Sequence, residues 1–136
     1  MKIRRYQDPD FEGVDALWSE AFPNDPPWNH AKNAIPAKQA FQPDLLFVAV
    51  EGTEVIGSVM AGYDGHRGWL YSVAVRQSDR RRGLGSRLVR HAEQALFALG
   101  CGKVNLQVRT SNEAIVRFYE RLGYAVEDRL SLGRHF

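Results

Sequence analysis

The run from Arg80 to Gly85, Arg-Arg-Arg-Gly-Leu-Gly, combines residue types that can bind an anion. Glycine lets successive backbone N–H groups turn toward one point, and the arginines surround that point with positive charge. A helix that begins here adds N–H groups without partners and the positive end of its dipole. A phosphate or pyrophosphate fits such a site. The alternative is a plain turn between a strand and a helix, with its arginines in solvent.

The segments on either side predict the strand and the helix that would position this loop. Before it, Trp69, Tyr71, Val73 and Val75 alternate with other residues, so we expect them on one face of a buried strand. After it, apolar residues recur at helical spacing, at Leu84, Leu88, Val89, Ala92, Ala95, Leu96 and Leu99. Strand, loop and helix are therefore expected as one unit from Tyr71 to Leu99.

Length and composition are those of an ordinary globular chain. Its 136 residues suffice for one compact domain with a real core and a small-molecule site. The single cysteine, Cys101, excludes an internal disulfide framework and fits a reducing compartment. The sequence has no long apolar span, and its N-terminus lacks a signal-peptide core. We expect a cytoplasmic protein with no membrane partner.

Positive charge is concentrated around the glycine loop, although the formal net charge is only +2. The arginines of this patch are Arg76, Arg80, Arg81, Arg82, Arg87 and Arg90, and Asp79 is the one acidic residue among them. Such a patch suits nucleic acid or an anionic cofactor. Because no aromatic residues are interleaved with the arginines, we expect no nucleic-acid partner. We also expect no metal.

The remaining segments predict a mixed sheet with about four flanking helices. Strands are expected at Lys2–Tyr6, Leu45–Val50, Glu54–Tyr63 and Lys103–Arg109, with one or two closing strands in Tyr124–Phe136. Further helices are expected after a cap at Asp8, over Asn29–Phe41 with a kink or split at Pro36, and from Asn112 to Leu122 before Gly123. Hairpin-linked strands come first and crossovers later, which favours an α/β (α+β) fold with a mixed, mostly antiparallel sheet.

Two motifs in this order resemble those of the GNAT acetyltransferases. Arg80, Gly83 and Gly85 fill the family's Gln/Arg-x-x-Gly-x-Gly/Ala loop after a strand. Asn112, Tyr119 and Leu122–Tyr124 are similar to a second signature of the family. The stretch from Tyr63 to Gly68 looks like the YpeA-like bacterial branch, and the likeness to ribosomal-protein N-terminal acetyltransferases is weaker. The resemblance implies one GNAT-like domain over residues 1–136, with strands four and five splayed apart.

The resemblance also implies acetyl-coenzyme A as the acetyl donor. Backbone N–H groups from Arg81 to Ser86 would bind its pyrophosphate, and the main chain of Val73 and Val75 would pair with its pantetheine arm like an added strand. Asn112 matches a further cofactor-contacting position, although it is equally a helix-start residue. The candidate cofactor-binding residues are Val73, Ala74, Val75, Arg80, Arg81, Arg82, Gly83, Leu84, Gly85, Ser86 and Asn112.

Acyl transfer from a thioester needs a neutral amine, a polarised carbonyl and a proton for the leaving thiolate. A backbone N–H near Val73 or Ala74 would stabilise the tetrahedral oxyanion. By the resemblance, Tyr119 is the general acid, a phenol with a pKa near that of a thiol. The alternative is a packed helix aromatic beside Phe118. We expect direct attack in a ternary complex by a primary amine, which is a small amine, an amino acid or a peptide N-terminus.

The residue that would act as general base by the resemblance is absent from this chain. Gln107 stands where the ribosomal-protein N-terminal acetyltransferases have a glutamate, and a glutamine side chain cannot accept a proton. Glu20, Asp64 and His66 are candidate bases, His30 is a weaker one, and an ordered water is another route. An α-amine, with a pKa of about 8, needs less help than a lysine side chain at about 10.4.

The loop Pro26–Asn29, with Trp18 and Phe22, lies where GNAT proteins form their acceptor pocket. Its aromatic residues would favour a hydrophobic or cationic acceptor, and the alternative is ordinary core packing.

Two other functions stay open. One is a non-catalytic acyl-coenzyme A-binding regulatory module, which the missing glutamate favours. The other, ranked last, is a nucleic-acid module built on the arginine patch. A homodimer is also left open.

Overall fold

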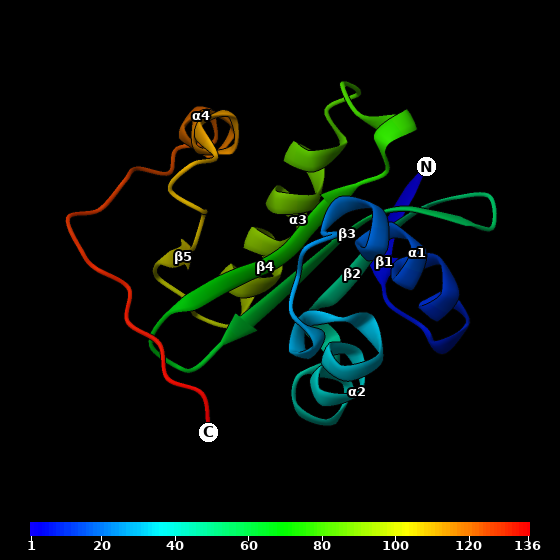
Figure 1. Ribbon diagram of the computed structural model, residues 1–136, viewed down its shortest axis with the longest axis horizontal. Coiled ribbons are helices and arrows are strands. Elements are labelled where there is room, and N and C mark those ends of the chain that lie inside the picture. Colours follow the sequence, from blue (N-terminus) through cyan, green and yellow to red (C-terminus); the bar gives the residue numbers. More distant parts are fainter. The chain divides into compact units, whose positions relative to one another are not determined.

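Five strands form one sheet, in the order β1-β2-β3-β4-β5, in the computed structural model, which describes residues 1–136 (Figure 1). The strands are β1 (Lys2–Arg5), β2 (Leu46–Glu51), β3 (Glu54–Tyr63), β4 (Gly68–Val75) and β5 (Val104–Leu106). Strands β1 to β4 pair antiparallel, and β5 joins β4 in parallel. The predicted mixed, mostly antiparallel sheet is confirmed.

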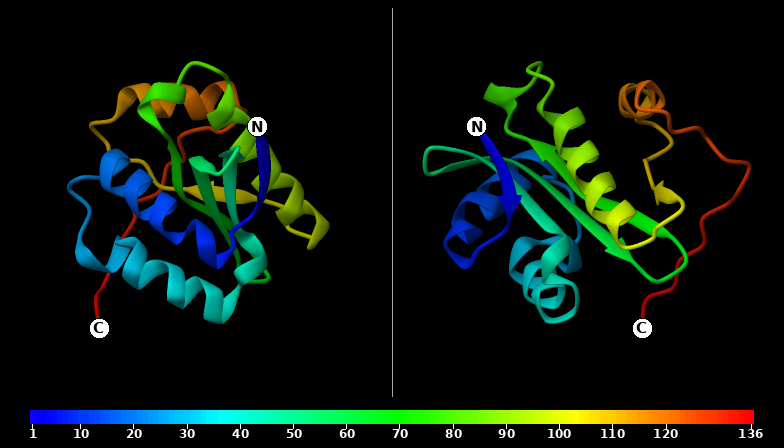
Figure 2. Two further views of the ribbon diagram at one scale, coloured as in Figure 1. Left: turned by 90° about the vertical axis from the view of Figure 1, so that its right-hand side faces the viewer. Right: turned by 180° about the vertical axis from the view of Figure 1, so that it is seen from behind.

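The chain has four α-helices, namely α1 (Phe11–Ala21), α2 (Ala31–Phe41), α3 (Leu84–Ala98) and α4 (Glu113–Arg121). The chain divides into two compact units, residues 1–106 and residues 107–136. Within the first unit, α1 and α2 cover one face of the sheet and α3 covers the other (Figure 2). None of the helices is long and apolar enough to cross a membrane.

Strand β2 shows why the sequence contains a continuous apolar run at this point. Val48 and Val50 belong to the core cluster that includes Trp18 of α1. Phe47 points to the other face, where its ring meets that of His91 of α3 edge-on with the centroids 4.6 Å apart. A strand covered by helices on both faces needs apolar residues at successive positions.

Strand β4 departs from simple alternation because it contains a β-bulge. Ser58 and Met60 of β3 pair with Ala74 and Tyr71, so the single β3 residue between them opposes two residues of β4. Ser72 lies in this extra step and has a left-handed backbone, with a φ of 52°. An added residue of this kind changes which face the following side chains occupy.

The bulge overturns the predicted face of β4. A side chain on Gly68 would point at Leu96 on the α3 side of the sheet, yet Ala74 lies in the core cluster with Trp18 on the α1 side. In a regular strand, residues six positions apart share a face. The prediction that Trp69, Tyr71, Val73 and Val75 share one buried face is therefore wrong. The buried residues of β4 are Gly68, Leu70 and Ala74.

Three details of the helices also differ from the prediction. Helix α2 runs unbroken through Pro36, since proline removes only one N–H bond from the helix, and the buried Ala31 and Ile35 anchor the turns before it. The cap position before the first helical turn is occupied by Gln7 rather than by the predicted Asp8, and the carboxylate of Asp10 accepts the N–H of Gln7 at 2.8 Å. Leu99 lies beyond the end of α3 and is 55% exposed, so it does not extend the buried stripe.

The second unit consists of α4 with the segments on either side of it. Asn112 caps α4 by accepting the N–H of Ile115 at 3.3 Å. Gly123 follows the helix with a φ of 98°, in the left-handed conformation that commonly ends helices. The closing strands predicted in Tyr124–Phe136 do not form. The large apolar side chains there are exposed, so no packing fixes an extended pairing.

Candidate active site

Strand β4 has a strand partner along only part of one edge. Its ladder with β5 covers Gly68 to Leu70, because β5 ends at Leu106 rather than at the predicted Arg109. The following segment, Tyr71–Val75, pairs with β3 alone. Strands four and five are thus splayed, and the backbone of this segment is free to pair with another extended molecule.

The edge groups of this segment belong to Val73 and Val75. The N–H of Arg76 donates to a carbonyl of β3 at 2.8 Å, and backbone groups of successive strand residues point to opposite sides. Val75 therefore directs its groups away from β3, and its carbonyl accepts the Nε of Arg80 at 3.1 Å. Ala74 directs its groups into the ladder with β3, so the structure favours Val73 over Ala74 as an edge donor.

The glycine loop opens α3, as predicted. Arg81 and Gly83 both have left-handed backbones, with φ of 68° and 72°, and Gly83 directly precedes the helix. The first bond inside α3 runs from the N–H of Arg87 to the carbonyl of Gly83 at 3.2 Å. The N–H groups of residues 84–86 therefore have no acceptor within the helix and lie at its positive end. This donor set fits a pyrophosphate.

Acidic residues neutralise part of the arginine patch. Asp79, only 6% exposed, accepts hydrogen bonds from Arg76 and Arg82, each at 2.7 Å. The Arg76 guanidinium beside it holds the pKa of this carboxyl below its ordinary value. Glu54 and Glu51 pair with the same two arginines from the β2–β3 hairpin. These ion pairs engage Arg76 and Arg82, so the backbone N–H groups are the better candidate donors for an anion at this loop.

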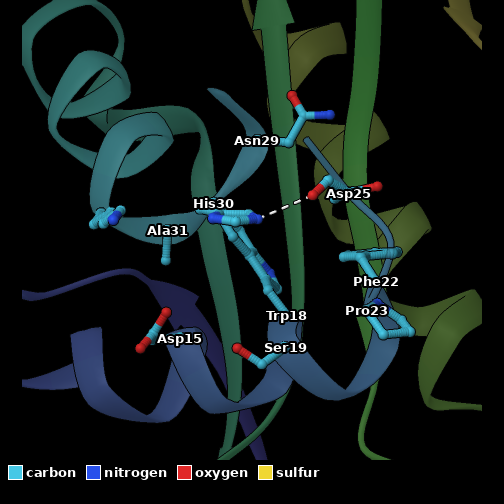
Figure 3. A pocket seen from close by; sticks show the side chains of 10 residues that line it. Asp15, Trp18, Ser19, Phe22, Pro23, Asp25, Asn29, His30 and Ala31 are labelled. Carbon is cyan, nitrogen blue, oxygen red and sulfur yellow. Dashed lines mark hydrogen bonds between the residues drawn. The ribbon is translucent and has the colours of Figure 1, made fainter. Parts of the chain in front are cut away.

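A cavity of about 410 Å³ is lined by α1, the loop after it and the start of α2 (Figure 3). Trp18 and Phe22 give it aromatic walls, and Asp15 and Asp25 give it carboxylates. His30 also lines it, with its Nε2 3.0 Å from the backbone carbonyl oxygen of Asp25. Aromatic and acidic groups together suit a cation.

The cavity contains only part of the predicted acceptor loop. Asn29 lines it, whereas Trp28 does not and is exposed. The alternative reading of Trp18 as core is also correct, because its side chain is buried in the core cluster while it borders the cavity.

Tyr119, in the second unit, packs between aromatic rings. Its ring meets those of Phe118 and Tyr124 edge-on, with centroids 5.0 Å and 5.6 Å away. The residue is 8% exposed, and burial raises the pKa of its phenol to about 12. The phenol is therefore protonated throughout the neutral range, but it is a weaker acid than an ordinary phenol. Gln107, in the same unit, donates its side-chain amide to the hydroxyl of Ser131.

Comparison with known proteins decides the family. The model of the Acetyltransferase (GNAT) family matches residues 11–124. The chain belongs to the GNAT acetyltransferases. An acetyltransferase of Pectobacterium atrosepticum is 42% identical over 134 residues, which are 98% of this chain and 94% of the relative. An acetyltransferase of Sodalis glossinidius is 42% identical over 132 residues, covering 97% and 92%.

Solved structures share the GNAT fold. The aminoglycoside N-acetyltransferase AAC(6')-Iy in complex with CoA superposes with a TM-score of 0.79 at 19% identity, covering 98% of this chain and 93% of that one. Ard1 from Thermoplasma volcanium gives a TM-score of 0.81 at 23% identity, covering 93% and 83%. At these identities the likeness establishes the fold alone.

The candidate bases of this GNAT protein lie in different places. Glu20 accepts the N–H of Gln77 at 3.0 Å, just after β4. Asp64 accepts the N–H groups of Arg67 and His66, both at 2.7 Å, and these bonds lower its pKa, which makes it a poor base. None of these candidates lines the cavity of Figure 3, whereas His30, the weakest candidate by sequence, does.

No sequence pattern points to Lys38, although the GNAT fold gives it an unusual environment. Its ammonium donates to the carbonyl of Ala61 and, at 3.3 Å, to the side chain of Gln42. Burial lowers the pKa of Lys38 to about 8. From the sequence, a lysine on a helix of mixed polarity is expected to lie in solvent. Lys38 reaches the sheet only because α2 packs beside β3.

Proposed function

We propose that this acetyltransferase transfers an acetyl group from acetyl-coenzyme A to a primary amine by direct attack in a ternary complex. The amine nitrogen forms a bond to the thioester carbon, the carbon–sulfur bond breaks, the thiolate takes a proton and the nitrogen loses one. One observation carries the proposal. The edge of β4 that has no strand partner leads, within one short loop, to the first turn of α3, whose N–H groups have no acceptor within the helix.

The donor site follows from that continuity. The edge groups of Val73 and Val75 would pair with the amide groups of the pantetheine arm, as an added strand does. A few residues later, the N–H groups of residues 84–86 would bind the pyrophosphate, with Gly83 giving the turn its left-handed backbone. Arg80, whose Nε lies at 3.1 Å from the Val75 carbonyl, would exchange that contact for the incoming arm.

The acceptor site is proposed in the cavity lined by Trp18, Phe22, Asp15 and Asp25. Its volume of about 410 Å³ suits a small molecule or the first residues of a peptide. The carboxylates and aromatic faces would bind an ammonium group. His30 is the proposed base, since its imidazole lines the cavity and a neutral imidazole has one ring nitrogen that can accept a proton.

The general acid is proposed to be Tyr119, on the strength of its motif. Its high pKa keeps the proton on the phenol until a strong acceptor forms. A hydrogen bond from that phenol would stabilise the departing thiolate. We further propose that residues 1–136 act as one catalytic domain, since the family match extends from residue 11 to residue 124 and so includes parts of both units.

The test is thiol release from acetyl-coenzyme A with a panel of small amines, amino acids and peptides. Saturable release that depends on one class of amine supports the proposal. Tight binding of acetyl-coenzyme A with no turnover on any amine overturns it and favours a regulatory binding module. His30→Gln should lower kcat, because it removes the proposed base, while KM for acetyl-coenzyme A stays unchanged. The matched control is His135→Gln, at an exposed histidine.

A further inference from the structure

A chain of buried hydrogen bonds runs from α1 to the bulge of β4. The indole Nε1 of Trp18 donates to the hydroxyl of Ser58 at 2.8 Å. That hydroxyl in turn donates to the backbone carbonyl of Ser72, also at 2.8 Å. Ser58 is 0% exposed and Trp18 is 4% exposed, so water does not compete for these bonds. We refer to Trp18, Ser58 and the Ser72 carbonyl as the relay.

The relay sets the direction of one particular N–H group. The carbonyl of Ser72 and the N–H of Val73 belong to the same peptide unit, which is planar and trans, so the two groups point in opposite directions. Because Ser58 of β3 binds the carbonyl, the N–H of Val73 points away from β3. It therefore faces the side of β4 that has no strand partner after Leu70.

This peptide needs such support because its backbone is strained. Ser72 has a φ of 52°, a left-handed conformation that is strained for a serine. The bulge also removes the regular ladder bonds that would otherwise hold the peptide plane. Without the Ser58 bond, rotation of the plane would relieve the strain and turn the Val73 N–H away from the edge.

We propose that Trp18 and Ser58 are positioning residues, which hold the N–H of Val73 where it stabilises the oxyanion of the acetyl-transfer reaction. This inference rests on the proposed function. The relay further aligns three donors in series, and each bond in such a series strengthens the next. Since Trp18 also lines the cavity of Figure 3, one side chain borders the proposed acceptor site and supports the oxyanion donor.

The test compares Ser58→Ala with Val48→Ala, a matched control. Val48 pairs with Ser58 across β2 and β3, is equally buried and belongs to the same core, but it carries no hydrogen bond of the relay. Ser58→Ala should lower kcat by about 30-fold, a part of what loss of an oxyanion donor costs. KM for acetyl-coenzyme A and Kd for coenzyme A, which has no acetyl carbonyl, should stay unchanged. Ser58→Thr, which keeps the hydroxyl, should restore kcat.

A second readout follows the N–H itself. In ¹⁵N-labelled wild-type protein, acetonyl-coenzyme A, which carries an unreactive ketone, should move the Val73 amide proton downfield relative to coenzyme A. The difference should vanish in Ser58→Ala, or in Ser58→Cys if the alanine variant does not fold.

The possible outcomes distinguish a failure of the relay from a failure of the proposed acetyl-transfer function. An active wild type whose Ser58→Ala variant keeps its kcat, or loses no more than Val48→Ala, overturns the relay alone. A Val73 amide shift that persists in the variant also overturns it. A wild type that transfers no acetyl group to any amine overturns both the function and the relay.

Discussion

Arg76 and Asp79, three residues apart, are joined by a hydrogen bond of 2.7 Å between Nε and a carboxylate oxygen. Arg76 directly follows β4, and the other oxygen of Asp79 binds Arg82, which directly precedes Gly83. One carboxylate thus connects the end of the β4 edge to the start of the α3 turn. It holds the two halves of the proposed donor site at a fixed spacing.

Asp79→Asn should loosen this connection. An amide cannot serve two guanidinium groups as a carboxylate does, so the loop loses its pre-ordered shape. KM for acetyl-coenzyme A should rise about tenfold, while KM for the amine stays unchanged. Steady-state kinetics of both substrates measure this, with Asp44→Asn, which breaks the exposed ion pair with Arg5, as the control. An unchanged KM for acetyl-coenzyme A in Asp79→Asn would show that the ion pairs do not shape the donor site.

Gly83→Ala should weaken the binding of coenzyme A by more than tenfold. At a φ of 72°, alanine is strained by about 1–2 kcal/mol, and relief of that strain would shift the N–H groups of residues 84–86. Gly52→Ala is the matched control, because Gly52 has a φ of 61°, and an added Cβ meets no atom within 4 Å at either site. Calorimetric titration measures Kd. Equal Kd values for the two variants would exclude the α3 turn from the donor site.

Much of this donor site is readable in the sequence, because its signals are local. Gly83 and Gly85 indicate where the loop ends and the helix begins. The apolar spacing from Leu84 to Leu96 predicts the helix itself. The continuous apolar run of Leu45–Val50 and the turn after it also predict β2 and β3 closely. These features depend on residues a few positions apart, which is the range over which periodicity and turn chemistry act.

The features that the sequence does not reveal depend on distant contacts. At the bulge in β4, Ser58 binds the Ser72 carbonyl across 14 residues, and no pattern in the strand itself predicts the reversal of faces. Glu54 and Glu51 meet the arginine patch only after the β2–β3 hairpin folds beside it. The exposed segment after Tyr124 carries strand-like residues without the packing that would make them a strand.

Tyr119→Phe should lower kcat by about 100-fold if the phenol supplies the proton or hydrogen bond for the thiolate. The ring stays in place, since its edge-on contacts with Phe118 and Tyr124 do not use the hydroxyl. Tyr124→Phe, in the same aromatic group, is the control and should keep its kcat. Rates measured at saturating substrates check this. Wild-type turnover in Tyr119→Phe would remove Tyr119 from the mechanism.

Tyr119 should also shape the alkaline stability of the protein. Burial raises the pKa of its phenol from 10 to about 12, so between these values the folded chain holds a proton that the unfolded chain has lost. The stability from this group is complete below pH 10 and is lost as the pH rises toward 12. Urea unfolding from pH 9.5 upward should show a smaller loss of unfolding free energy in Tyr119→Phe. A parallel loss in both proteins would contradict the raised pKa.

Lys38 should act on stability in the opposite direction and at lower pH. Burial lowers its pKa from 10.5 to about 8, so between these values the unfolded chain binds a proton that the folded chain has released. The contribution of Lys38 to the free energy of unfolding therefore rises with pH from about 8 to 10.5. Lys38→Met removes this rise, whereas Lys32→Met, at an exposed lysine of the same helix, retains it. Urea midpoints at pH 7.5, 9 and 10 measure the difference. An identical pH dependence in wild type and Lys38→Met would show that the ammonium of Lys38 is as well solvated in the folded chain as in the unfolded chain.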